Sequence, residues 1–155
     1  MTRREFAVWY AETWLGRWYT WAGDDPSGID CSGLVVEVGK ATGVLPRGKA
    51  KDWSADGLYQ MSIRKGWIVS DAGLRPGAWV FYLNAEGTKA IHVELVSRNP
   101  AIAIGASGGG SSVRSVSDAI RENAFIKPRP WASRSGPRAF ADPYWKDEIG
   151  LTPDS

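Results

Sequence analysis

The chain contains one cysteine, Cys31, and one histidine, His92, and these two side-chain types together can perform nucleophilic catalysis. A thiolate is a strong nucleophile, and imidazole is the side chain whose pKa suits proton transfer near neutral pH. If the chain holds a Cys-His pair, it is this one. The alternatives are that Cys31 is a small core residue and that His92 only packs or meets solvent at the start of a strand.

The residues around Cys31 favour the catalytic interpretation. Turn-forming residues fill positions 24–28, and apolar residues recur at helical spacing after Gly33, so we expect a loop followed by a helix whose first turn carries Cys31. Asp30 is of the N-cap type, and the dipole and free N–H groups of a helix start favour a thiolate. The small residues Ser32 and Gly33 leave the sulfur reachable, with Ser32 lining the site.

A third group is expected to hold the imidazole in the right tautomer. Alternation along the predicted strand puts His92 and Glu94 on one face. If residues 99–100 form a two-residue connection, the next strand places Gly105 opposite Glu94 and Ser107 opposite His92. Ser107 is therefore the predicted third residue. Glu94, about 6 to 7 Å away along the same strand, is the alternative.

Tyr19 lies in an aromatic stretch at 17–23, directly before the cysteine segment. Its hydroxyl is a candidate donor to an oxyanion, whereas the tryptophans Trp18 and Trp21 in the same stretch are expected to fill the core. We therefore predict a site in which Cys31 is the nucleophile, His92 its base and Tyr19 a lining residue.

Composition limits the function classes. A chain of 155 residues with 43% apolar and 23% charged residues matches one globular domain, and its net charge of +2 is too small to argue for nucleic-acid binding. No basic segment followed by an apolar run opens the chain, and no 18-residue apolar run is present. We therefore expect synthesis in the cytoplasm without a signal peptide, and no membrane span. One cysteine excludes an internal disulfide, and one cysteine with one histidine cannot build a common zinc site, so neither a metal nor a cofactor is expected.

Periodicity predicts helices first and antiparallel strands afterwards, which is an α+β fold. A Thr2-Arg-Arg-Glu5 capping box opens the first helix. We place a catalytic domain at 1–130 and a C-terminal tail at 131–155 that packs on it or extends from it, with the chain lying over the surface from Pro128. Further helices are predicted at 31–42, 52–64 and 117–123, and strands at 67–70, 78–83, 90–97, 101–106, 112–116 and 124–127.

Five stretches, taken in order, resemble the motif series of the NlpC/P60 cysteine peptidases, and the resemblance spans roughly residues 3 to 116. They are Tyr19-Thr-Trp-Ala-Gly23, Ile29-Asp-Cys-Ser-Gly-Leu-Val35, Gly43-Val-Leu-Pro-Arg47, Arg75-Pro-Gly-Ala-Trp-Val-Phe81 and Ile91-His-Val93. The resemblance implies a papain-like core in which N-terminal helices pack on a five- to six-stranded antiparallel sheet. It also implies hydrolysis of amide bonds in the peptide stems of bacterial peptidoglycan, commonly between D-glutamate and diaminopimelate. By motif position Cys31 is the nucleophile, His92 the base and Tyr19 the site-lining tyrosine.

The chain departs from the family pattern at three places. Ala78 stands where the family often has aspartate, and Glu94 replaces the glycine usual two residues after the histidine. The third polar residue of the family would fall near Gly105, which has no side chain. Either Ser107 or a water takes that role, or the triad is reduced.

The short single-domain form without a leader resembles versions found in phage and prophage tails, where the virion brings the enzyme to the cell wall. The expected partners are then peptidoglycan and phage tail proteins. An antibacterial effector injected into rival cells would share these features. An alternative of another class is a catalytically weak or inactive structural tail or wall-binding module, which the missing side chain at Gly105 motivates.

Overall fold

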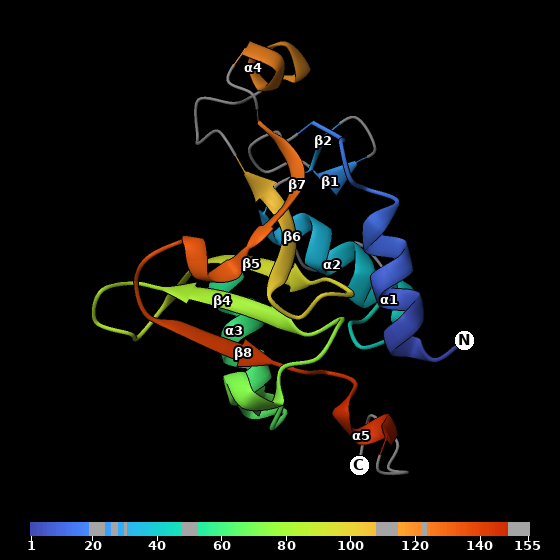
Figure 1. Ribbon diagram of the computed structural model, residues 1–155, viewed down its shortest axis with the longest axis vertical. Helices are drawn as coiled ribbons and strands as arrows, with labels where there is room; N and C mark the ends of the chain where they lie inside the picture. The colour runs from blue at the N-terminus through green and yellow to red at the C-terminus, as the bar shows by residue number, and fades with distance from the viewer. Residues whose placement is uncertain are drawn as a thin grey trace.

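The computed structural model describes residues 1–18, 24–25, 28–29, 31–47, 53–107, 115–121 and 124–148, with only the backbone at positions 24–25, 28–29, 31, 107, 116 and 119. A six-stranded sheet in the order β3-β8-β4-β5-β6-β7 is accompanied by helices, with α4 and α5 at opposite ends of the molecule (Figure 1). The helices are α1 (Arg3–Glu12), α2 (Cys31–Thr42), α3 (Ala55–Arg64), α4 (Val116–Arg121) and α5 (Trp145–Glu148). The strands are β1 (Asp24–Asp25), β2 (Gly28–Ile29), β3 (Ile68–Val69), β4 (Trp79–Leu83), β5 (Ala90–Val96), β6 (Ile102–Ser107), β7 (Phe125–Pro130) and β8 (Arg138–Ala141).

Local signals in the sequence set the helix ends. The predicted capping box is present: the Thr2 hydroxyl accepts from the Glu5 backbone N–H at 3.1 Å, and a Glu5 carboxylate oxygen lies 3.4 Å from the Thr2 backbone nitrogen. Helix α2 has the predicted bounds and is followed by Gly43 at φ +80°, a conformation that glycine adopts without strain. Helix α3 begins after Ser54, whose hydroxyl accepts from the Gly57 backbone N–H.

The sheet separates two apolar clusters. Alternate residues of β4, β5 and β6 pack with residues of α1, α2 and α3 in the larger cluster, and the remaining residues of these strands face the other side. The pair Val96 and Ala103 confirms the register predicted for β5 against β6. Residues facing the helices include Trp79, Phe81, Val93, Leu95 and Ile104, and those in the second cluster include Val80, Tyr82, Ala103 and Phe140.

The C-terminal segment differs from the predicted surface tail. Strand β7 continues to Pro130, and β8 lies inside the sheet, paired with both β3 and β4. Strand β7 is at the sheet edge, and only its start, at Phe125 and Ile126, also bonds the segment at 16–18. Pro128 and Pro130 lie beyond that contact, so their missing N–H groups break no second ladder. The predicted strand at 112–116 is also wrong at its end, where Val116 begins α4; residues 112–114 lie outside the described part. The division into 1–130 and 131–155 stays a prediction.

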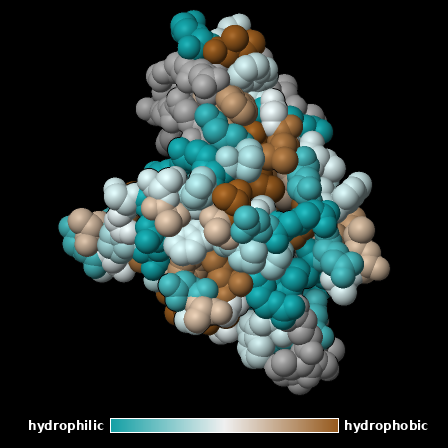
Figure 2. Space-filling view, viewed as in Figure 1, coloured by the Kyte–Doolittle hydropathy of each residue, from teal (hydrophilic) through white to brown (hydrophobic). Residues whose placement is uncertain are grey.

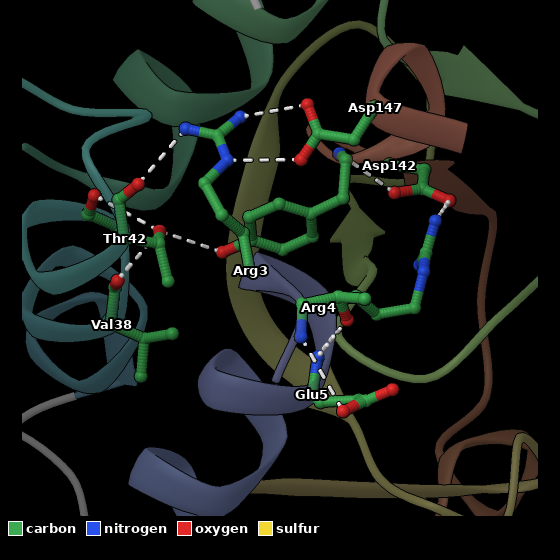
Figure 3. Close-up of polar contacts among 10 residues, drawn as sticks. Arg3, Arg4, Glu5, Val38, Thr42, Asp142 and Asp147 are labelled. Atoms are coloured by element: carbon green, nitrogen blue, oxygen red, sulfur yellow. Dashed lines mark hydrogen bonds and ion pairs between the residues drawn. The ribbon is translucent and has the colours of Figure 1, made fainter. Parts of the chain in front are cut away.

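Two arginines at the start of α1 bind the C-terminal segment (Figure 3). Arg4 Nη2 lies 2.9 Å from Asp142 Oδ2, and Arg4 Nη1 donates to the Pro76 carbonyl oxygen at 2.8 Å. Arg3 Nε lies 2.9 Å from Asp147 Oδ2 in a more exposed pair. The Arg3–Asp147 pair therefore joins the first and last described helices, and the Arg4–Asp142 pair joins α1 to the segment between β8 and α5.

The surface seen in Figure 2 is mostly hydrophilic, with small scattered hydrophobic patches. Within the described ranges, no helix combines the length and the apolar character needed to cross a membrane.

Candidate active site

His92 is the third residue of β5 and is almost fully buried, with 8% of its side chain exposed. It pairs with Tyr82 of β4, and the centroids of the two rings are 5.5 Å apart. Because neighbours on a strand alternate, His92 and Glu94 lie on the same sheet face as Tyr82, while Val93 and Leu95 pack toward the helices. The imidazole thus has a rigid strand as its support.

The Glu94 carboxylate, 2% exposed, lies between the imidazole and the tyrosine. Its Oε2 is 3.2 Å from His92 Nε2, and its Oε1 accepts from the Tyr82 hydroxyl at 2.8 Å. Nε2 has no well-aligned hydrogen-bond acceptor among the described residues, so the two groups stand within ion-pair distance without a formed hydrogen bond, and the contact is an ion pair only when the imidazole is protonated. Such contacts are often loose in unliganded sites.

The surroundings of Glu94 favour its ionised form. Burial by itself raises the pKa of this carboxyl, but contact with His92, the hydrogen bond from Tyr82 and the charge of Arg129 outweigh burial, so the pKa is lowered from its ordinary value. A carboxylate therefore faces the histidine at neutral pH.

Tyr82 acts as a hydrogen-bond donor in this group. Burial first, and then the charge of Glu94, raise the pKa of Tyr82, which keeps the hydroxyl protonated. The oxygen also lies 3.0 Å from the Trp131 carbonyl oxygen, and the single hydroxyl proton can serve only one of these two acceptors at a time. The Arg134 guanidinium stands 5.1 Å from the centre of the Tyr82 ring.

Gly105 on β6 leaves the space that the Glu94 side chain fills. A Cβ atom added at Gly105 would lie 2.5 Å from both Cγ and Oε2 of Glu94, closer than real Cβ contacts allow. A side chain at position 105 and the glutamate at position 94 are therefore mutually exclusive in this arrangement.

The predicted site residues fall into two groups. The structure brings His92 and Glu94 together and places Cys31 as the first residue of the 12-residue helix α2, with Ser32 buried next to it. Ser107 ends β6, and the predicted pairing of Ser107 with His92 stays a prediction, because the ladder described between the two strands ends at Leu95 and Ile104.

Tyr19 and Asp30 lie outside the described residues, so their predicted roles as a site-lining residue and an N-cap stay predictions. Sequence reasoning missed Tyr82 as a member of the site. The available signal was its place in a strand beside the histidine strand, and using that signal requires the register between the two. No group of three or more metal-binding side chains that could hold a metal ion is found in the described part of the chain.

Comparisons with known proteins agree on the fold. The NlpC/p60 domain of the peptidoglycan hydrolase SagA superposes with a TM-score of 0.62 at 19% identity, covering 90% of this chain and 98% of that one. RipD from Mycobacterium tuberculosis, described as a non-catalytic NlpC/p60 domain protein adapted to peptidoglycan binding, gives 0.61 at 16% identity, with 92% and 98% covered. The peptidoglycan hydrolase RipB from the same organism gives 0.59 at 22% identity, with 90% and 64% covered. No curated protein matches the sequence.

A comparison with protein families matches residues 16–130 to the NlpC/P60 family. The solved structures add that the α+β, papain-like arrangement of helices on an antiparallel sheet extends over nearly the whole chain. Because the family match covers most of the sequence and includes both Cys31 and His92, this chain belongs to the NlpC/P60 family.

Proposed function

We propose that this protein is a thiol hydrolase that cleaves amide bonds in the peptide stems of peptidoglycan. The observation that carries the proposal is the ionised Glu94 beside a buried His92, the only histidine of the chain. A carboxylate against an imidazole stabilises the imidazolium that forms when the ring takes a thiol proton. Cys31, the only thiol, begins a helix, where the dipole favours its anion.

In the proposed mechanism the Cys31 thiolate attacks the carbonyl carbon of a stem-peptide amide. The Cys31 backbone N–H and the Tyr19 hydroxyl hold the oxyanion, with Ser32 lining the site. Protonated His92 gives its proton to the leaving amine, and the carbon–nitrogen bond breaks to leave a thioester on Cys31. His92 then takes a proton from water, which attacks the thioester, releases the acid and restores the Cys31 thiolate beside protonated His92.

The finer parts of the proposal concern the bond and the delivery. The proposed bond is the one between D-glutamate and diaminopimelate, because the five sequence motifs resemble those of NlpC/P60 peptidases, which commonly cleave it. The proposed setting is a phage tail, with tail proteins as partners and the cell wall as the place of action. Delivery as an injected antibacterial effector is the alternative.

A digest of purified sacculi tests the activity. Wild-type protein should release stem-peptide fragments that mass spectrometry identifies by mass and by the new amino and carboxyl termini. Cys31→Ala should release none while keeping the circular dichroism spectrum and melting temperature of the wild type. Retained product in the folded Cys31→Ala variant would end the proposal. Cleavage elsewhere than between D-glutamate and diaminopimelate would overturn only the bond assignment.

A second candidate function is binding of peptidoglycan without hydrolysis. It is supported by Gly105, which leaves position 105 of β6, where the family pattern has a polar residue, without a side chain, and by the likeness in fold to RipD, described as non-catalytic. A sacculus pull-down combined with the digest separates the two functions. Binding without fragments, together with a thiol that reacts slowly at about pH 6, would favour the binding module over the hydrolase.

A further inference from the structure

Two neighbouring positions on the sheet carry the inference: Glu94 in β5 and Gly105 in β6. The glutamate side chain extends through the volume above the glycine, as the 2.5 Å approach to an added Cβ shows. Its two oxygens then have different tasks, since Oε1 accepts from Tyr82 and Oε2 faces His92. The absence of a side chain at position 105 is thus what permits the carboxylate to reach the imidazole.

We propose that Glu94 is the positioning residue of His92, holding the Nε2 side of the ring from the same strand so that Nδ1 is the nitrogen that exchanges protons during the reaction. This inference rests on the proposed hydrolase function for its catalytic meaning. The structural part, that Glu94 selects the Nε2–H tautomer, stands without a substrate.

Hydrogen-bond donors and acceptors around His92 decide which of its ring nitrogens carries the proton. An ionised carboxylate offers no proton, so the imidazole nitrogen that faces it is stable there only as N–H. Oε2 of Glu94 lies 3.2 Å from Nε2, and both side chains are more than nine-tenths buried, so little water competes for that nitrogen. Neutral His92 therefore carries its proton on Nε2, and its Nδ1 keeps a free lone pair.

The position of the carboxylate is itself constrained. Tyr82 donates to Oε1 from β4, and Arg129 on β7 adds a positive charge to the surroundings of Glu94. Arg134 lies over the Tyr82 ring on the same side. A carboxylate held by a hydrogen bond on one oxygen has its other oxygen oriented, which is the requirement for holding an imidazole in one rotation.

The first experiment reads the tautomer directly. The chain has one histidine, so nitrogen-15 NMR of the imidazole gives one pair of ring signals that need no assignment to a residue. Couplings to the carbon-bound ring protons distinguish Nδ1 from Nε2, and protonated and unprotonated nitrogens differ widely in chemical shift. At a pH where the ring is neutral, wild-type protein should show Nε2 protonated and Nδ1 unprotonated. A proton on Nδ1, or an equal mixture as in a free imidazole, would overturn the proposal. This outcome does not depend on any activity.

The second experiment uses Glu94→Gln, with Glu12→Gln as the matched control. Glu12 belongs to an exposed ion pair with Arg98 and has no described contact with His92, Glu94 or Tyr82, so the same chemical change there should leave tautomer and activity as in wild type. Glu94→Gln should lose the single-tautomer signature and reduce kcat/KM on stem peptides at least about 100-fold, with the loss mainly in kcat. Identical NMR signals and pH–rate profiles in both variants would refute the role.

An exchange of the two residues separates positioning from packing. Glu94→Gly should lose activity, and adding Gly105→Glu should recover at least about tenfold of it, because the carboxylate then reaches the same space from β6. The control is Glu94→Gly with Gly105→Ala, which fills space without an oxygen and should recover none. Equal recovery in both double variants would show that volume alone matters and would overturn the proposal.

These tests separate the positioning role of Glu94 from the proposed hydrolase activity. Wild-type protein with Nε2 protonated but no fragments from sacculi would remove the hydrolase proposal and leave the positioning of His92 in place. Fragments released by a protein whose His92 carries its proton on Nδ1 would do the reverse.

Discussion

The substitution Asp142→Asn should destabilise the protein much more than the same change at Asp147. Both carboxylates pair with arginines at the start of α1, at the same distance of 2.9 Å. They differ in burial, since the side chains of Arg4 and Asp142 are 9% and 2% exposed and those of Arg3 and Asp147 are 30% and 28% exposed. Figure 3 shows both pairs beside each other.

The magnitude follows from that difference. Removing one partner of a buried pair leaves a buried charge and costs about 3 to 5 kcal/mol. We expect the lower end, about 3 kcal/mol, because asparagine keeps one oxygen, which can replace either Oδ2 as the acceptor for Arg4 or Oδ1 as the acceptor for the Tyr144 N–H, each at 2.9 Å. The more exposed pair is worth about 0 to 1 kcal/mol. For a chain of this size the first change should lower the melting temperature by about 10 °C.

Urea unfolding followed by tryptophan fluorescence measures both variants, with the m-value checked against wild type. Asp142→Asn should show the large loss in free energy of unfolding and Asp147→Asn a loss within about 1 kcal/mol. Equal losses at the two sites would refute the reasoning that burial of the pair decides its contribution. The same result would also weaken the conclusion that the segment after Pro130 is held firmly to α1.

Three further predictions concern the histidine site and the first helix. Gly105→Ala should push Glu94 away from His92 and lower kcat on stem peptides while the protein stays folded; unchanged kcat would show that the glutamate can move without loss. The folded-state pKa of Glu94 lies below its unfolded value, so its stabilisation is complete above the unfolded value and is lost as the pH falls through the folded one. The difference in urea midpoint between wild type and Glu94→Gln should therefore shrink from about pH 7 to about pH 3, and a constant difference would contradict the lowered pKa. Thr2→Ala removes the capping box with Glu5 and should cost about 1 kcal/mol in urea unfolding, and no measurable cost would mean that solvent replaces the cap.

Local patterns in the sequence predict much of this fold. Helix α2 has the predicted bounds because a run of turn residues precedes it and Gly43 follows it. A short connection between β5 and β6 predicts their register, and the observed pairing of Val96 with Ala103 confirms it. These features depend on neighbours in the chain, which is why sequence alone suffices for them.

Other features depend on contacts between distant segments. Strand β8 pairs with β3 and β4 across long stretches of chain, and its four residues carry little strand signal beside a stretch rich in proline and glycine. The predicted strand at 124–127 is present, but the prolines argue against its continuing past Lys127, and the position of β7 at the sheet edge is what makes them compatible with a strand to Pro130.

The candidate site shows the same division. The residue types identify Cys31 and His92 as a possible pair, but the choice among Ser107, Glu94 and water needs side-chain positions. Backbone positions two residues apart on a strand, as at His92 and Glu94, are about 6 to 7 Å apart. The Glu94 side chain closes that distance because Gly105 leaves the space that it fills.

The central claim is that Cys31 gives its proton to His92, and alkylation of the only thiol tests it most directly. An ordinary thiol with a pKa near 8.5 is only about 0.3% ionised at pH 6, so iodoacetamide reacts slowly with it there. Intact-mass measurement at about pH 6 should show wild-type Cys31 labelled roughly tenfold faster or more than Cys31 in a folded His92→Gln variant. Equal labelling rates in the two folded proteins would contradict the account.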